Sequence, residues 1–149
     1  MAMIQLPQDF KDFLKLLKSY EVRYLLIGGY AVIYHGYPRA TGDMDIWVDI
    51  SPENALKLVE VLKEFGFEVP ELSPKLFLER GKGIRMGLPG VRMELLTSIS
   101  GVRFDECFDS RIIEKMDDVK INIINLEFLE RNKQAGGRYK DLSDLENLP

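Results

Sequence analysis

Two aspartates separated by a single residue, Asp43 and Asp45, impose the strongest constraint on how this chain can fold. They lie in the run Gly42-Asp43-Met44-Asp45-Ile46-Trp47-Val48-Asp49. In an extended strand successive side chains point to opposite faces, so the two aspartates share one face while Met44, Ile46 and Val48 point to the other. The sequence therefore predicts a strand with one acidic face and one buried face.

The spacing of the two carboxylates has an electrostatic cost. Their Cβ atoms are about 6.5 to 7 Å apart in a strand, and at an effective dielectric constant of about 20 their repulsion is about 2.5 kcal/mol. A divalent cation between them would convert that cost into binding energy. Hard oxygen ligands suit Mg²⁺ or Mn²⁺ rather than zinc, and the chain has a single His and a single Cys. The alternative to a metal site is that the two aspartates bind nothing and lie at the end of a strand because Asp favours turns.

A glycine pair precedes the acidic strand. Gly28 and Gly29 follow the apolar run Tyr24-Leu25-Leu26-Ile27, which predicts a strand, and precede a short helix predicted from Tyr30 to His35. A strand that turns directly into a helix exposes backbone N–H groups, and glycine lets a phosphate approach without an intervening side chain. We therefore expect Gly28 and Gly29 to contact phosphate groups of a ligand.

The remaining pattern mixes helices and strands. Helical periodicity and capping residues predict helices at 8–19, 52–65, 125–134 and 140–147. Apolar runs predict strands at 67–69, 84–88, 91–96, 112–116 and 119–124, and residues 70–82 are expected to form helix and loop. The turn pair Pro89-Gly90 predicts a hairpin that places Glu94 on an antiparallel strand, opposite in face to the buried Met93 and Leu95. This order predicts one α+β domain over residues 1–149, a mixed sheet with helices packed on it.

Taken together, the strand, the glycine pair, the short helix and the acidic pair resemble the nucleotidyltransferase superfamily that includes DNA polymerase β. The resemblance implies a nucleotidyltransferase fold and the transfer of a nucleoside monophosphate from a nucleoside triphosphate (NTP) to a hydroxyl group, with release of pyrophosphate. It implies that Asp43 and Asp45 are catalytic and bind Mg²⁺ or Mn²⁺ with a third carboxylate from a later strand. Glu94 supplies that carboxylate here, where the family more often has aspartate.

The resemblance also implies four further nucleotide contacts. Arg39 and Thr41 match an Arg-x-Thr stretch before the acidic pair in small members of the family, and Arg39 is expected to hold a phosphate or to orient an aspartate. Lys133 and Lys140 belong to a basic run in a C-terminal segment that looks like the closing helices of small bacterial members, and they are expected to contact phosphates. Each basic residue has an alternative interpretation as part of a solvated surface.

Two aromatic side chains near these motifs have alternative interpretations. His35 ends the short helix and is expected to cap or pack against it rather than act as a base. Trp47 lies on the same strand face as the aspartates, where it could stack on a base, although packing in the core or at its rim is the favoured interpretation.

The composition and net charge restrict the classes of partner that this chain is expected to bind. A formal net charge of -4 argues against broad, non-specific binding of nucleic acid, although a local basic patch is compatible with it. A single cysteine and the lack of a long apolar run or export signal predict a cytoplasmic protein without a membrane span. The acceptor hydroxyl could belong to tRNA, a protein or a small molecule, and the sequence does not define the oligomeric state.

The small bacterial members that the chain resembles include antibiotic adenylyltransferases and the toxins or antitoxins of abortive-infection systems. A second hypothesis follows from that group. The chain could be a non-catalytic, nucleotide-binding partner or antitoxin, the neutralising half of a two-gene pair whose other protein is encoded by a neighbouring gene.

Overall fold

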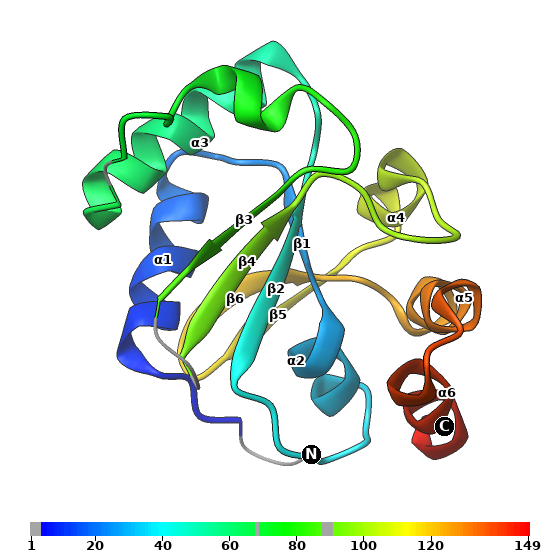
Figure 1. Cartoon of the computed structure of the whole chain (residues 1–149). Coiled ribbons are helices and arrows are strands. Elements are labelled where there is room, and N and C mark those ends of the chain that lie inside the picture. Colours follow the sequence, from blue (N-terminus) through cyan, green and yellow to red (C-terminus); the bar gives the residue numbers. More distant parts are fainter. Residues whose placement is uncertain (1–3, 68, 88–90) are drawn as a thin grey trace.

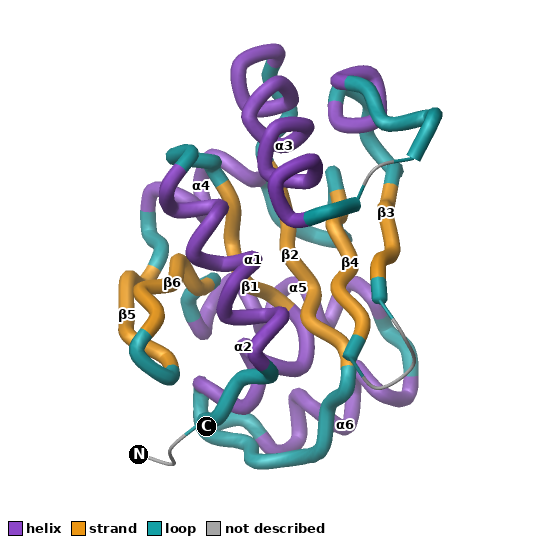
Figure 2. Tube along the Cα trace, turned by 90° about the vertical axis from the view of Figure 1, so that its left-hand side faces the viewer, coloured by secondary structure: helices purple, strands orange, loops and turns teal. Residues whose placement is uncertain are grey.

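A six-stranded mixed sheet forms the centre of the described part of the chain, with helices on both of its faces (Figures 1 and 2). The computed structural model describes residues 4–67, 69–87 and 91–149. The strand order is β3-β4-β2-β1-β6-β5. The strands are β1 (Tyr24–Ile27), β2 (Asp43–Val48), β3 (Gly83–Met86), β4 (Arg92–Leu96), β5 (Ile112–Met116) and β6 (Val119–Ile123).

The two central strands carry the glycine pair and the acidic pair. β1 runs antiparallel to β2 on one side and parallel to β6 on the other, while β2 runs parallel to β4. The outer pairs, β3 with β4 and β5 with β6, are antiparallel hairpins. This combination of parallel and antiparallel pairs, with helices between and after the strands, defines an α+β fold and confirms the predicted fold class.

Helices cover both faces of the sheet. The helices are α1 (Gln8–Ser19), α2 (Gly28–Tyr34), α3 (Pro52–Phe65), α4 (Phe104–Asp109), α5 (Leu126–Gly136) and α6 (Tyr139–Asn147), with a 3₁₀ turn at Pro74–Phe77. In Figure 1, α1 and α3 lie to the left of the sheet, and α4, α5 and α6 lie to its right. The C-terminal helices are therefore placed beside the face on which the acidic residues lie.

Helix α3 has a sequence-encoded start and stop. The Ser51 hydroxyl accepts a hydrogen bond from the backbone N–H of Asn54 at 3.1 Å, and Pro52 occupies the first turn, where its missing N–H costs nothing. Gly66 ends the helix in the left-handed conformation with a φ of 97°. The predicted span 52–65 is confirmed because each of these signals is local.

Helix α1 packs, through an apolar stripe, on the side of the sheet away from α5 and α6 (Figure 1). Phe10, Phe13, Leu14 and Leu17 recur at helical spacing and are fully buried. Burial of each such side chain contributes about 1.5 to 3 kcal/mol. Packing against the sheet, rather than helix propensity, therefore stabilises α1.

The structure corrects the sequence-based prediction at a few places. The strand predicted at 67–69 is wrong for Phe67 and Val69, which lie in the connection after α3, and residue 68 is outside the described residues. The predicted turn Pro89-Gly90 is also outside them. Helix α2 begins at Gly28 rather than Tyr30, so the glycine pair lies within the first turn of the helix. Helix α4 was not predicted.

None of the helices in the described ranges is both long enough and apolar enough to cross a membrane.

Candidate active site

The parallel pairing of β2 with β4 brings two of the predicted acidic residues side by side. Asp45 is the register partner of Glu94, and neighbouring strands lie about 4.7 to 4.9 Å apart. Met93 and Leu95, which flank Glu94, are buried as predicted, so Glu94 points to the face opposite the core. Asp43 is exposed at the start of β2, one strand repeat from Asp45. The three acidic residues therefore lie on one face of the sheet, with Asp45 and Glu94 side by side.

The Asp45 carboxyl is held in an environment that opposes its ionisation. Burial and the neighbouring charges of Glu94 and Asp43 raise the pKa of Asp45, while Lys140 and Lys133 oppose that rise. Without a bound cation, the ionised Asp45 therefore lowers the stability of the fold. A carboxylate whose charge is costly in the protein alone is suited to bind a positive ion.

Gly28 makes room for Asp45. The residue has a φ of 68°, and a Cβ atom there would collide with Oδ2 of Asp45. A side chain at Gly28 would thus meet both backbone strain and a steric clash. The first turn of α2 and the Asp45 side chain therefore pack closely, with no room for a side chain at residue 28.

The Gly28→Ala substitution tests this fit, with Gly66→Ala as a matched control. Gly66 also has a positive φ, 97°, but a Cβ there meets nothing within 4 Å, so its substitution reports the backbone strain alone, roughly 1 to 2 kcal/mol. We expect Gly28→Ala to lower the free energy of unfolding by a further 1 to 3 kcal/mol, roughly the cost of overpacking. Equal losses in urea unfolding of the two variants would contradict the predicted clash.

Gly29 is packed against the loop that leads into β2. A Cβ atom at Gly29 would lie 2.5 Å from Oγ1 of Thr41 and 3.4 Å from Nη1 of Arg39. Thr41 donates a hydrogen bond of 3.2 Å from Oγ1 to the backbone carbonyl of Asp43. Thr41 therefore shapes the entry to β2, whereas its predicted contact with nucleotide stays a prediction.

Arg39 forms an ion pair with Asp144 on α6 rather than with an aspartate of β2, so its predicted roles at a phosphate or beside the acidic pair stay predictions. Its Nε and Nη2 donate to Oδ1 and Oδ2 of Asp144 at 2.8 and 3.0 Å. Two parallel hydrogen bonds between guanidinium and carboxylate form the most specific type of ion pair. The loop before β2 is thereby fixed to α6.

Asp144 is part of a larger group of ionised side chains, here called the C-terminal ion network. Lys133, on α5, lies 3.0 Å from Asp144 and 3.5 Å from Asp141, measured from Nζ to the carboxylate oxygens. Arg138 closes the group with Nε to Asp141 Oδ2 at 2.9 Å. Lys133, Asp141 and Asp144 are all buried. The network joins the loop before β2 to both C-terminal helices.

Pairing keeps the two buried aspartates ionised. Burial by itself opposes the charge of Asp144, but hydrogen bonds from Arg39 and Lys133 prevail and lower its pKa. The pKa of Asp141 is lowered in the same way, against burial, by the hydrogen bond from the Arg138 side chain. In this structure Lys133, a predicted phosphate contact, is committed to these two aspartates.

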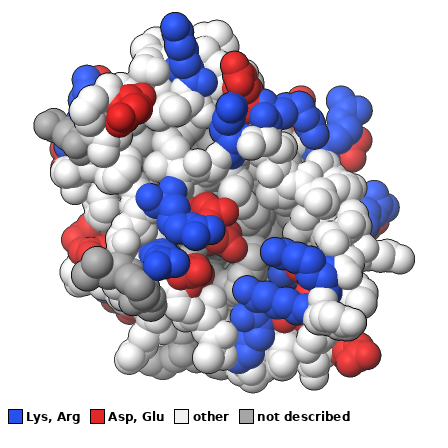
Figure 3. Space-filling model, viewed as in Figure 1, with Lys and Arg blue, Asp and Glu red and all other residues white. Residues whose placement is uncertain are grey.

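A cleft of about 410 Å³ connects the acidic residues to the basic ones. Its lining includes Gly28, Gly29, Asp45 and Glu94 on one side, and Lys133, Arg138, Lys140 and Asp141 on the other. Figure 3 shows a hollow in this face, with acidic groups and neighbouring Lys or Arg side chains on its left and a group of Lys and Arg side chains on its right. The exposed Lys140 lies on the basic side of this cleft, and its predicted contact with a phosphate stays a prediction.

Glu94 has an arginine partner. Arg85 on β3 contacts Oε2 of Glu94 through Nε at 3.1 Å and Nη2 at 3.0 Å. Across residues 4–67, 69–87 and 91–149, no three His, Cys, Asp or Glu side chains are gathered closely enough to hold a metal ion by themselves. Asp45 and Glu94 nevertheless fit Mg²⁺, which commonly takes one or two carboxylates together with phosphate oxygens of a substrate.

The two aromatic residues behave as the favoured interpretations predicted. Nε2 of His35 lies 2.7 Å from the backbone carbonyl of Ile124, and burial lowers the pKa of His35. His35 therefore packs at the end of α2. Trp47 is 2% exposed and packs edge to face on Phe104, with ring centroids 5.1 Å apart.

The sequence did not single out three residues that the structure places in or beside this site. Asp141 and Asp144 lie three apart on α6 and face inward, although nothing in their spacing indicates partners on another element. Arg85 faces Glu94 because β3 pairs with β4, with Arg85 and Glu94 in register. Alternation along β3 places Arg85 opposite the buried Met86, which was the available signal.

Comparison with known proteins supports the fold. The sequence matches no protein-family profile and no curated protein. A solved structure of a putative nucleotidyltransferase from Thermotoga maritima is similar to this chain, with a TM-score of 0.62 and 18% sequence identity over 96% of this chain and 94% of that one. At that identity the similarity defines the fold, so the chain has a nucleotidyltransferase-like fold.

Proposed function

We propose that this protein is a nucleotidyltransferase that requires Mg²⁺ or Mn²⁺ and transfers a nucleoside monophosphate from an NTP to a hydroxyl group. The observation that carries the proposal is the register of Asp45 with Glu94 beside Gly28, in a cleft whose opposite wall is basic. Carboxylates for a cation and a basic wall for a triphosphate then share one cavity. We propose Asp45 and Glu94 as metal ligands in this cleft, with Asp43 as a further carboxylate that would act together with phosphate oxygens of the substrate.

The residues in and around the cleft have distinct roles in the proposed reaction. Gly28 and Gly29 let the β- and γ-phosphates approach the first turn of α2, and Lys140 balances their charge. Thr41 and Arg39 hold the loop that positions the aspartates, while Lys133 acts through Asp141 and Asp144. A bound divalent cation would neutralise charge on the triphosphate.

In the proposed reaction the acceptor oxygen forms a bond to the α-phosphorus. The bond from the α-phosphorus to the bridging oxygen of the β-phosphate breaks, and pyrophosphate leaves with that electron pair. The hydroxyl proton passes to a carboxylate of the site. No oxidant or reductant is required.

Turnover with labelled NTPs tests the proposal. The wild-type protein is incubated with each NTP, Mg²⁺ and total tRNA or a protein and metabolite extract, and transferred label is followed in each fraction. Label in one fraction identifies the acceptor class. Absence of transfer with every NTP and every fraction would refute the proposed activity.

The raised pKa of Asp45 predicts how cation binding depends on pH. Protons and Mg²⁺ compete for the same carboxylate, so we expect the stabilisation by Mg²⁺ with NTP to weaken as the pH falls through the raised pKa of Asp45. A cation at a hundred times its dissociation constant should add about 2.7 kcal/mol to the free energy of unfolding. Thermal unfolding with Mg²⁺ across a pH series measures this effect, and a stabilisation independent of pH would argue against Asp45 as a ligand.

A second candidate function is supported by the contact of Arg85 with Glu94. A guanidinium that neutralises the third carboxylate suits a protein that binds nucleotide without turning it over, the partner or antitoxin of a two-gene system. An Arg85→Gln variant separates the two functions. A gain of transfer in this variant would indicate that Arg85 restrains catalysis, whereas NTP binding without transfer in both forms favours the binding protein.

A further inference from the structure

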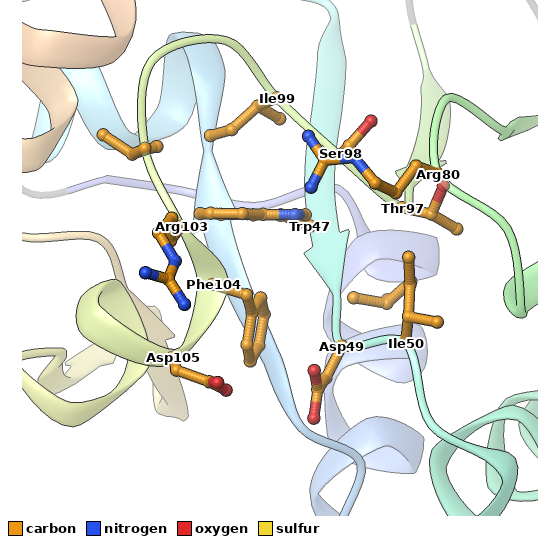
Figure 4. Close-up of a pocket in the computed structure, with 12 residues that line it drawn as sticks. Trp47, Asp49, Ile50, Arg80, Thr97, Ser98, Ile99, Arg103, Phe104 and Asp105 are labelled. Carbon is orange, nitrogen blue, oxygen red and sulfur yellow. The ribbon is translucent and has the colours of Figure 1, made fainter.

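A second cavity, of about 250 Å³, lies beside the cleft, past the end of β2 (Figure 4). Ser98 and Ile99 line both the cavity and the cleft, so the two are adjacent. Trp47 forms one wall. Its position on β2 is one strand repeat from Asp45, so the Cβ atoms of the two residues are about 7 Å apart. A molecule in this cavity would lie next to the acidic residues.

The indole of Trp47 presents a hydrogen-bond donor that the protein does not satisfy. Trp47 is 2% exposed, and its Nε1 is buried without a hydrogen-bond partner among the described residues. In Figure 4 this nitrogen is at the end of the ring nearer Ser98 and Arg80. Because an unpaired buried donor is costly, such groups commonly have a ligand or a water as partner. An indole N–H can only donate, so the missing partner is an acceptor atom.

Two arginines add further donors. Within the described ranges, the guanidinium groups of Arg80 and Arg103 form no hydrogen bond or ion pair, and in Figure 4 they lie near opposite ends of the Trp47 ring. The cavity also includes Asp49 and Asp105, but Arg23 pairs with both, at 2.9 and 3.8 Å. The donors that remain unpaired in this cavity are therefore mainly cationic.

The position of Arg80 is fixed by the end of β4. The Thr97 hydroxyl donates to the carbonyl of Glu79 at 2.7 Å and accepts from the N–H of Lys82 at 3.0 Å. The Ser98 hydroxyl accepts from the N–H of Gly81 at 2.9 Å. These bonds hold the turn that carries Arg80 over the cavity. The donor that Ser98 retains, its O–H, lies where cavity and cleft meet.

We propose that this cavity binds an oxyanion, a phosphate or carboxylate group, through Arg80, Arg103 and the indole N–H of Trp47. Given the nucleotidyl transfer proposed above, on which this step rests, the oxyanion belongs to the acceptor and places the acceptor hydroxyl beside Asp45. The acceptor is thereby restricted to molecules that carry an anionic group close to the reacting hydroxyl. The cavity supplies binding and orientation and takes no part in the bond changes.

Trp47 is the single tryptophan of the chain, so its fluorescence reports this cavity directly. Inorganic phosphate and acetate are titrated separately into the wild-type protein, with chloride at equal ionic strength as the control, and binding is measured in parallel by calorimetry. We expect a saturable change in Trp47 emission with phosphate or acetate, and the stronger of the two identifies the preferred oxyanion.

Three variants locate the binding. The Arg80→Gln/Arg103→Gln double variant should bind the oxyanion at least about tenfold more weakly, because each hydrogen bond to a charged group contributes strongly to affinity. Lys140→Gln, which alters the nucleotide cleft, should retain the Trp47 response, as should Lys120→Gln on the exposed side of β6. Thermal unfolding checks that each variant is folded.

The outcomes distinguish this inference from the proposed function. A Trp47 response that is lost in Lys140→Gln but kept in the double variant would place the anion in the cleft and overturn the proposal, as would the absence of both response and binding heat in the wild type. If NTPs are neither bound nor transferred while phosphate still perturbs Trp47, the nucleotidyltransferase activity is refuted and the oxyanion site stands. If both sites operate, the double variant should bind NTP normally and transfer its nucleotide poorly.

Discussion

The Asp45→Asn variant should lose nucleotidyl transfer by roughly a thousandfold while gaining stability. The loss follows because Asp45 is the proposed metal ligand closest to the glycine turn. Electrostatic stabilisation of the transition state by a bound cation contributes several kcal/mol, and each loss of about 1.4 kcal/mol slows the reaction tenfold. The gain follows because Asn removes a charge that burial, Glu94 and Asp43 all oppose. We expect a rise of about 1 kcal/mol in the free energy of unfolding, as is common when a functional charge is removed.

Two measurements on the same variant test both parts. Label transfer from NTP gives the activity, and urea unfolding without Mg²⁺ gives the stability. Asp109→Asn, on the exposed surface of α4, is the matched control and should change neither. A variant that is less stable and equally active would show that Asp45 is a structural residue. Addition of Mg²⁺ should stabilise the wild type and leave Asp45→Asn unchanged.

Asp144→Asn should destabilise the protein by about 3 to 5 kcal/mol, the usual cost of removing one partner from a buried ion pair. Asp144 is 1% exposed and pairs with both Arg39 and Lys133. Its replacement leaves Lys133 buried with Asp141 at 3.5 Å as its remaining partner. It also frees Arg39, and with it the loop that leads to the acidic strand.

Urea unfolding measures the loss, with Glu146→Gln as the control because Glu146 is an exposed acid on the same helix. The control should lie within about 0.5 kcal/mol of the wild type. A small loss in Asp144→Asn would mean that water reaches the C-terminal ion network. If Lys133 instead acts directly on phosphate, Asp144→Asn should tighten NTP binding by freeing that lysine.

The dependence of stability on pH has opposite signs at the two sets of aspartates. The folded-state pKa values of Asp141 and Asp144 are lowered, so their contribution is complete above the unfolded value, about 3.9, and is lost as the pH falls through the folded values. The raised pKa of Asp45 has the reverse effect, since the fold loses stability as the pH rises from about 3.9 through that pKa. Asp45→Asn should remove the second effect and leave the first.

Features specified by neighbouring residues could be predicted from the sequence. The ends of α3 depend on Ser51, Pro52 and Gly66, all close to the helix itself, and the buried face of β2 follows from simple alternation. Helix α4 could not be predicted because its six residues are too few to display a period. Its fixed position depends on distant contacts, such as the guanidinium of Arg23 at 4.3 Å from the Phe108 ring.

The arrangement of Asp45 and Glu94 could be predicted only in part, because it depends on strand pairing as well as on local alternation. Alternation gave the correct faces for Asp45 and Glu94, but no local pattern specifies that β4 pairs beside β2 with these two residues in register. The C-terminal ion network was beyond prediction because Arg39 and Asp144 are 105 positions apart. The basic run suggested a phosphate site, whereas Lys133 is buried at the cleft and paired with Asp141 and Asp144, and Lys140 lines the cleft as an exposed lysine.

The register of β2 with β4 also has a consequence for folding. A slip of one residue between these strands would turn Glu94 into the apolar interior and expose Leu95 to water, so misaligned pairings are penalised twice. Burial of the apolar face of β4 and the placement of Glu94 beside Asp45 are thus a single cooperative event. A partly folded chain that lacks this ladder should have no affinity for a divalent ion, and metal titration can serve as a probe of native strand alignment.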